Sequence, residues 1–241
     1  MHVFDQSSCR LSVIGYRLSG RGGVGTTDNR QPTTDNRFAT LPPVKLIVGL
    51  GNPGSEYAKS RHNVGWMIAD AFAAKFRIKI SKHEKEAMTG SGRVAGGAVV
   101  VAKPLTYMNR SGDAVSLLAN AYTESLQDLI IVYDEVDLPL GKLRIRERGS
   151  SGTHNGMRSI VASLASEDFP RLRFGVRGAN YAEDGRLRDY VLDDFEESEL
   201  PIVSRSIERA VDALVLFARG ELRRAMNEFN RDSDNESLET T

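Results

Sequence analysis

Apolar residues along the chain occur in two patterns, short continuous runs and longer stretches with a period of three to four residues. Continuous runs at 44–48 and 129–132 predict buried strands, because a strand covered on both faces has no polar side. The helical period predicts helices at 64–76, 112–122, 155–164, 197–219 and 222–229. Ser111 is the expected N-cap of the second helix, and Gly220 is expected to end the fourth.

Three further stretches predict strands of other kinds. β-branched residues at 94–102 surround Gly96 and Gly97 and indicate a hairpin. Basic and apolar residues alternate at 142–146 and at 171–177, which predicts strands with one basic face. The second of these is expected to be half-exposed, with Arg171, Arg173 and Arg177 on the basic face. Another candidate strand covers 76–80.

Strands and helices that alternate with short connections indicate an α/β fold. We expect a single three-layer α/β/α domain over residues 44–230, with a twisted, mostly parallel mixed central sheet. Functional sites in such sheets lie beyond the carboxyl ends of the strands. The sequence therefore directs attention to the loops that follow the predicted strands.

The two ends of the chain lack this pattern. Residues 1–43 are polar and contain the pentapeptide TTDNR twice, so we expect a disordered N-terminal extension. Its arginines and hydroxyls leave a transit peptide open, and a start codon assigned too far upstream explains it equally well. Residues 231–241 are expected to form a flexible polar tail.

Composition narrows the class of protein. The 241 residues include 32 basic and 32 acidic side chains, so any affinity for nucleic acid must come from local charge. The single cysteine, Cys9, excludes a disulfide framework and fits a reducing cytoplasm. No apolar run approaches the roughly 18 residues that span a bilayer. We expect a cytoplasmic protein without membrane contact, a monomer with no evident protein partner.

The first predicted strand is followed by Gly49, Gly51 and Gly54, which have the G-x-G-x-x-G spacing of dinucleotide-binding turns. In such folds the turn opens directly into an amphipathic helix, and an acidic residue ends the next strand. Here Pro53 interrupts the turn, the helix begins only near Asn63, and Ser81 and Lys82 follow the next candidate strand. We therefore expect no nucleotide cofactor and interpret the segment as a site loop, which presents Asn52, Tyr57, Arg61 and His62.

Polar groups follow three more predicted elements. Asn109 lies in the stretch KPLTYMNRSG ahead of a helix, and Asp134, Glu135 and Asp137 come directly after the buried strand at 129–132. The stretch RGSSGTHNG at 148–156 leads into a helix whose free N–H groups favour an anion. Each stretch alone is equally well explained as an ordinary loop.

Taken together and in order, these stretches resemble bacterial-type peptidyl-tRNA hydrolases over residues 45–230. The matching motifs are GLGNPG-x-Y-x-x-x-RHNVG, KP-x-T-x-MN-x-SG, YDE-x-DLP-x-G, HNG-x-x-S-I, F-x-RLR-x-GV and YVL. The resemblance implies a hydrolase that cleaves the ester between a peptide and the 3′ ribose of tRNA. It implies catalytic roles for His62 as general base, Asp134 as its partner, and the amides Asn52 and Asn109. It further implies substrate binding by Tyr57, Met108, His154 and Asn155.

The chemistry of these residue types agrees with that assignment. Histidine has a pKa near neutrality, so His62 can take a proton from water, and an aspartate can orient the ring and stabilise its charged form. Neutral amides can donate to a developing oxyanion. No G-x-S-x-G elbow supplies a serine nucleophile, and His2, His62, His83 and His154 lack the spacing of a helical zinc site. We expect neither a metal nor a cofactor.

Residues 137–178 contain eight basic and four acidic side chains. Their local excess of positive charge favours contact with tRNA phosphates through Lys142, Arg144, Arg146 and Arg173. Solvated faces on edge strands are the other explanation. The chain has no signature of a base-reading RNA module, so we expect it to recognise shape, phosphate and the acceptor end.

Four positions depart from the family pattern, namely Thr153, Arg177, Asp193 and Asp194. They bear on tRNA affinity and on the mobility of the loops, whereas the proposed catalytic set is intact. An alternative function is that of a catalytically silent RNA-binding protein, similar to splicing factors of the same fold. Residue identity alone does not distinguish the two functions.

Overall fold

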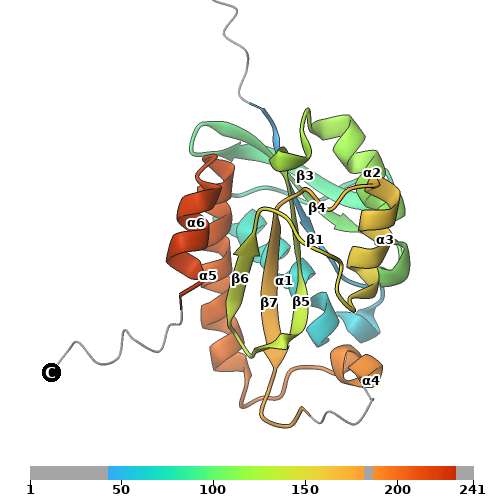
Figure 1. Ribbon diagram of the computed structural model, residues 1–241, viewed down its shortest axis with the longest axis vertical. Helices are drawn as coiled ribbons and strands as arrows, with labels where there is room; N and C mark the ends of the chain where they lie inside the picture. Colours follow the sequence, from blue (N-terminus) through green and yellow to red (C-terminus); the bar gives the residue numbers. More distant parts are fainter. Residues whose placement is uncertain (1–42, 182–186, 232–241) are drawn as a thin grey trace, which may run out of the picture. The chain divides into compact units, whose positions relative to one another are not determined.

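The computed structural model describes residues 43–181 and 187–231 (Figure 1). The expectations for the extension at 1–43 and the tail at 231–241 therefore lie almost entirely outside the described residues. Among the described helices, none has both the length and the apolar character needed to cross a bilayer.

The centre of the fold is a seven-stranded mixed sheet in the order β2-β3-β4-β1-β5-β7-β6. Its four middle strands pair in parallel, and β2, β3 and β6 add antiparallel pairings at the two edges. The strands are β1 (Lys45–Gly49), β2 (Lys82–Glu84), β3 (Ala87–Val94), β4 (Gly97–Pro104), β5 (Leu129–Pro139), β6 (Leu143–Arg146) and β7 (Arg171–Arg177).

Helices cover both faces of the sheet, which confirms the expected α/β/α class (Figure 1). α1 (Val64–Lys75) and α5 (Leu200–Ala218) pack on one face, and α2 (Ser111–Tyr122) and α3 (Asn155–Leu164) pack on the other. α6 (Leu222–Phe229) packs against α5 and β6. The six-residue α4 (Leu187–Leu192) lies near the carboxyl end of β5 and β7 (Figure 1).

The continuous apolar run of β1 reflects burial on both faces of the sheet. Ile47 points into the core beneath α1 and α5, whereas Leu46 and Val48 point into the core beneath α2 and α3. All three side chains are fully buried. A strand between two helical layers has no solvent-facing side, so polar alternation is absent.

Glycines at the end of β1 and at the start of α1 allow close packing of the backbone. A Cβ atom on Gly49 would collide with the carbonyl of Gly65 at the start of α1, and one on Gly65 would collide with backbone atoms of Leu50 and Val132. A Cβ atom on Gly51 would lie 2.7 Å from the indole of Trp66. These glycines let α1 begin directly against the ends of β1 and β5, which brings His62 close to Asp134. Packing thus explains Gly49 and Gly51 of the G-x-G-x-x-G spacing, whereas Gly54 has φ +122°, a conformation that favours glycine.

Several predicted boundaries are confirmed. The helices at 155–164 and 222–229 match α3 and α6 at both ends, and Asn63 directly precedes α1. Gly220 follows α5 with φ +79°, and the N–H groups of Gly220 and Glu221 donate to the carbonyls of Phe217 and Leu216. This double hydrogen bond is the Schellman arrangement that glycine favours.

Other predictions are wrong in ways that the packing explains. Residues 76–80 form no strand, because Ile78 and Lys79 pack against Gly90 and Gly92 of β3 instead of joining a ladder. Ser111 is the first residue of α2 and not its N-cap, since its hydroxyl donates to the carbonyl of Met108.

The acidic stretch and the last long helix also differ from expectation. β5 continues to Pro139, so Asp134, Glu135 and Asp137 lie within the strand and do not follow it. Pairing of β5 with β7 extends the strand past a register irregularity between Glu135 and Pro139. α5 begins at Leu200 and not at 197.

Candidate active site

The carboxyl-terminal side of the sheet contains a cavity of about 800 Å³. All eight residues for which the sequence predicted a catalytic or substrate-binding role line it, and they come from four separate segments. These residues are Asn52, Tyr57, His62, Met108, Asn109, Asp134, His154 and Asn155. The structure thus brings together side chains that are up to 103 positions apart in the chain, from Asn52 to Asn155.

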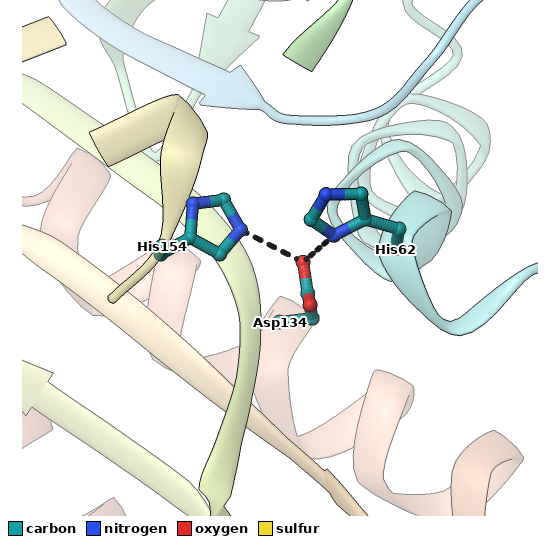
Figure 2. Close-up of side chains that lie close together, drawn as sticks. All are labelled: His62, Asp134 and His154. Atoms are coloured by element: carbon teal, nitrogen blue, oxygen red, sulfur yellow. Dashed lines mark hydrogen bonds and ion pairs between the residues drawn. The ribbon is translucent and has the colours of Figure 1, made fainter. Parts of the chain in front are cut away.

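Asp134 lies between two histidines at the base of this cavity (Figure 2). Its Oδ1 is 2.8 Å from Nδ1 of His62 and 3.0 Å from Nε2 of His154. Asp134 is 2% exposed and His62 is 8% exposed. A buried carboxylate that accepts two hydrogen bonds on one oxygen holds both rings in defined orientations.

The hydrogen bonds define the proton positions on both rings. Nδ1 of His154 accepts the backbone N–H of Met157 at 3.2 Å, which makes His154 the N-cap of α3. Nδ1 is therefore unprotonated, and Nε2 carries the proton that His154 donates to Asp134. His62 must donate through Nδ1 to the same oxygen. In the neutral His62 ring, Nε2 is then the free base, on the side of the ring away from Asp134 (Figure 2).

The electrostatics of the pair favour a charged imidazole beside a charged carboxylate. Burial by itself lowers the pKa of His62, but the charge and hydrogen bond of Asp134 outweigh it and raise that pKa above 6.5. Burial also raises the pKa of Asp134, and the two histidines more than reverse this, so the pKa is well below its usual range. Asp134 consequently stays ionised and can stabilise a proton on His62.

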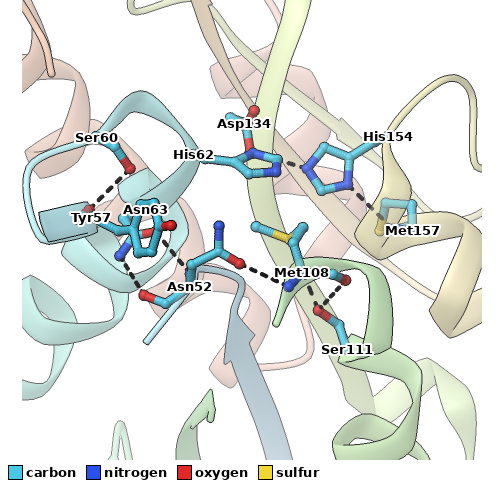
Figure 3. Close-up of polar contacts among 10 residues, drawn as sticks. All are labelled: Asn52, Tyr57, Ser60, His62, Asn63, Met108, Ser111, Asp134, His154 and Met157. Carbon is cyan, nitrogen blue, oxygen red and sulfur yellow. Dashed lines mark hydrogen bonds and ion pairs between the residues drawn. The ribbon is translucent and has the colours of Figure 1, made fainter. Parts of the chain in front are cut away.

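Asn52 is fixed beside His62 by hydrogen bonds of its side-chain oxygen, its backbone N–H and its backbone carbonyl. Its Oδ1 accepts the backbone N–H of Met108 at 2.8 Å. Its own backbone N–H donates to Oδ1 of Asn63 at 2.8 Å, and its carbonyl accepts from Nδ2 of Asn63 at 3.0 Å. Because the amide oxygen is engaged, the amide nitrogen of Asn52 faces His62, as Figure 3 shows. This arrangement offers an N–H donor at the base of the cavity.

The other two amides lie at the rim. Asn109 and Asn155 are exposed, and both line the cavity. Oδ1 of Asn155 accepts from the guanidinium of Arg158, one turn further along α3, so its amide nitrogen remains a donor. Tyr57 lines the cavity from the loop before α1, where its carbonyl accepts from Ser60 (Figure 3).

The four predicted tRNA contacts lie outside the lining of the cavity. Lys142, Arg144 and Arg146 belong to edge strand β6 and the residue before it, and Arg173 lies beside Arg144 on β7. Arg173 pairs with Glu135 at 3.0 Å. The cavity lining includes two other basic residues, Arg158 and Arg188.

The expected exposed basic face of β7 is wrong at Arg171. This side chain is buried, and its guanidinium donates to the carbonyls of Gly149, Ser150 and Glu167. Burial lowers its pKa, and the stack over Phe169 at 4.5 Å completes its surroundings. Arg171 thus braces the loop that leads to His154.

Three features of the site differ from the sequence prediction or go beyond it. Asn63 fixes the backbone of Asn52. Arg61 was expected among the side chains that the site loop presents, but it is buried and does not line the cavity. α4 supplies a wall of the cavity through Leu187, Val191 and Leu192. Asn63 carries a usable signal, since it directly follows His62 at the start of a helix. The six-residue α4 is too short to show a helical period, and the signal that it carries is the family motif YVL at residues 190–192.

The ligand atoms of His62, Asp134 and His154 lie within 4.8 Å of one another, a spacing that a metal ion could use. The hydrogen bonds to Asp134 account for that proximity, because both histidines donate to its oxygen. Metal binding would require both N–H donors to give up their protons. The donor set therefore fits a hydrogen-bonded base better than a metal centre.

Comparisons with known proteins agree with the geometry. The sequence model of a family described as "Peptidyl-tRNA hydrolase" matches residues 46–237. A protein of that name from Clostridium botulinum (strain Alaska E43 / Type E3) is 42% identical over 193 residues, which are 80% of this chain and 99% of the relative. Another from Caldanaerobacter subterraneus subsp. tengcongensis is 44% identical over 185 residues, covering 77% and 98%. The crystal structure of peptidyl-tRNA hydrolase from Acinetobacter baumannii superposes with a TM-score of 0.73 at 34% identity, covering 79% of this chain and 96% of that one.

Proposed function

The chain belongs to the peptidyl-tRNA hydrolase family, and from that premise we propose that His62 activates the water that cleaves the ester of peptidyl-tRNA. Membership confirms the resemblance seen in the six sequence motifs. The chain is a hydrolase of this family. The roles of individual residues below are our proposal.

The observation that supports this mechanism is the fixed tautomer of His62. Nε2 of the neutral ring takes a proton from water while the water oxygen forms a bond to the ester carbonyl carbon. Asp134 stabilises the imidazolium that results, since its carboxylate accepts from Nδ1 at 2.8 Å. The tetrahedral intermediate then collapses, the bond to the ribose 3′ oxygen breaks, and Nε2 returns the proton to that oxygen.

The amides complete the site by donating hydrogen bonds. We propose that the amide nitrogen of Asn52 serves the oxyanion or the scissile ester, because it is held beside His62 with its oxygen already engaged. Asn109 and Asn155 at the rim would bind the peptide backbone and the terminal nucleotide, with Tyr57, Met108 and His154 as further walls.

For the tRNA body we propose phosphate contacts from Lys142, Arg144, Arg146 and Arg173. These side chains follow β6 and β7 away from the cavity, as a path for an RNA backbone requires. Peptidyl-tRNA is a product of translation, so we place the activity in the cytoplasm. We propose that the reaction needs no cofactor, since His62, Asp134 and the amides supply each proton transfer and hydrogen bond. We also propose that the protein acts as a monomer.

Release of the acyl group from a purified N-acyl-aminoacyl-tRNA tests this function. The proposal requires that the protein converts the substrate to free tRNA and N-acyl amino acid. A catalytically silent RNA-binding relative would retain the tRNA and leave the ester intact. Retention of tRNA with an intact ester would show that this member of the family lacks the hydrolase activity.

A further inference from the structure

Arg61 directly precedes the proposed base His62, yet it contacts a distant part of the chain. Arg61 is 3% exposed, and its guanidinium contacts residues 190–199, more than 120 positions further along the sequence. Residue Arg61 does not line the cavity. Because the Arg61 side chain does not face the cavity, its role is not direct contact with substrate. Its contacts with other segments indicate what that role is.

The hydrogen bonds and the ion pair of the Arg61 guanidinium join it to the segment that follows α4. Its Nη2 pairs with Oε2 of Glu199 at 2.6 Å, and both side chains are almost fully buried. Its Nη1 donates to the backbone carbonyl of Asp194, and its backbone N–H donates to the carbonyl of Asp193 at 3.0 Å. The segment at 193–199 is therefore held by an ion pair, by a side-chain hydrogen bond and by a main-chain hydrogen bond, all from Arg61.

The guanidinium also packs against α4 itself. It lies over the ring of Tyr190 at 4.5 Å from the ring centre. The hydroxyl of Tyr190 donates to the carbonyl of Val176 and accepts from the N–H of Gly178, each at 2.8 Å. Through Tyr190, α4 thus contacts both the residue before His62 and the end of β7.

α4 presents the opposite side to the cavity. Leu187, Arg188, Val191 and Leu192, hereafter the α4 wall, line it together with His62 and Asp134. α4 spans only six residues, and isolated helices of that length are unstable. The position of the α4 wall relative to His62 therefore depends on tertiary contacts, and these include the contact of Arg61 with Tyr190.

A purely stabilising role explains the Arg61–Glu199 pair poorly. Replacing a buried ion pair by apolar side chains is often neutral or stabilising, because desolvation offsets the attraction. What the pair provides is a defined geometry, since a guanidinium donates in fixed directions. The departures at Asp193 and Asp194 leave this geometry intact, because Arg61 uses their backbone carbonyls and their side chains are exposed.

We propose that Arg61 is a positioning residue that, through Glu199 and Tyr190, holds the α4 wall at the distance from His62 at which substrate is bound. The inference rests on the proposed function of this cavity. It assigns the pair to substrate affinity and leaves proton transfer to His62 and Asp134. If a variant keeps the wall in place only about a tenth of the time, the apparent KM rises about 10-fold.

The test uses two variants on the α4 side, so that the neighbour of His62 is left unchanged. Glu199→Gln keeps the shape and removes the charge, and Tyr190→Phe keeps the ring over Arg61 and removes the hydroxyl. Glu197→Gln is the matched control, because Glu197 is an exposed carboxylate two residues before Glu199. Steady-state kinetics on N-acyl-aminoacyl-tRNA and thermal unfolding are measured for the full chain.

We expect KM to rise about 10-fold in both variants, with kcat within about 2-fold and the pH profile of kcat unchanged. Partial unfolding would give the reverse, a lower apparent kcat with unchanged KM, because the remaining folded molecules bind normally. That result, an unchanged KM, or an equal rise in the Glu197→Gln control would each overturn the proposal.

An uncleavable substrate analogue separates this proposal from the proposed hydrolysis. In the analogue an amide replaces the ester between the N-acyl amino acid and the 3′ position of the terminal adenosine. Its Kd is expected to rise by the same factor as KM in Glu199→Gln and Tyr190→Phe. Failure of hydrolysis in the wild type would refute the function alone, whereas equal Kd values in wild type and variants would refute the positioning role alone.

Discussion

Replacing Asp134 by asparagine isolates the contribution of one negative charge to the site. The carboxylate is 2% exposed, and its Oδ1 accepts from Nδ1 of His62 at 2.8 Å and from Nε2 of His154 at 3.0 Å. Asparagine has the same size, and its amide oxygen can still accept these hydrogen bonds. The substitution therefore removes the counter-charge of the imidazolium while the packing remains.

The expected loss follows from the attraction between the two charges. Two unit charges about 4 Å apart attract by about 4 kcal/mol at an effective dielectric constant of about 20. His62 carries its positive charge only once it has taken the proton of water, so the loss falls on the transition state. At a factor of ten per 1.36 kcal/mol, kcat at the plateau pH falls by about 10³-fold.

The pH dependence of the variant supplies a second, independent sign. A general base works in its neutral form, so kcat/KM rises with pH through the pKa of His62, which lies above 6.5 in the wild type. In Asp134→Asn, burial lowers this pKa without the opposing carboxylate. The acidic limb of the profile should therefore move to lower pH while the plateau drops.

The assay is kcat/KM for release of the acyl group from N-acyl-aminoacyl-tRNA, measured from about pH 5 to about pH 9 to span the histidine range. Asp137→Asn is the matched control, because Asp137 is an exposed aspartate on the same strand. A wild-type plateau in Asp134→Asn, or an acidic limb that stays in place or moves to higher pH, would refute the pairing of His62 with Asp134.

Three further predictions concern the donor, the packing and the tRNA path. Asn52→Ala should lower kcat by about 10²–10³-fold in the same assay. A rise in KM with unchanged kcat would exclude an oxyanion role for Asn52. Gly65→Ala should reduce the free energy of unfolding by about 1–3 kcal/mol in urea titrations, whereas Gly97→Ala, where a Cβ atom has ordinary contacts, should not. The apparent KM for full tRNA substrate should rise steeply with salt, and replacing Arg144 and Arg146 by glutamine should flatten the dependence by about one charge each, a slope unchanged in the double variant arguing against this path.

Sequence periodicity predicted the boundaries of a helix well where the helix buries one side against a single layer of the fold. α3 buries one side against α2 and the sheet, and its apolar period marked both ends correctly. The boundaries of β5 and α5 depended on distant partners. β5 extends because β7 pairs with it beyond Asp134, and no local pattern encodes that partner.

The members of the site were predictable from motifs, but their arrangement was not. The sequence gives no sign that His62 and His154, 92 positions apart, donate to the same carboxylate oxygen. The distance between them is set by the parallel sheet and by the glycine contacts that bring α1 against β1 and β5. The burial of Arg61 and Arg171 was not predicted, because burial of an arginine depends on backbone carbonyls supplied by other segments.

The central claim is that His62 removes the proton from the attacking water. Its most direct test is single-turnover cleavage of N-acyl-aminoacyl-tRNA by His62→Ala, with His83→Ala, an exposed histidine on β2, as control. Affinity for the uncleavable amide analogue is measured on the same samples. We predict that His62→Ala binds the analogue normally and cleaves the ester at least about 10²-fold more slowly, while His83→Ala is unaffected. Cleavage by His62→Ala at the wild-type rate would contradict the account.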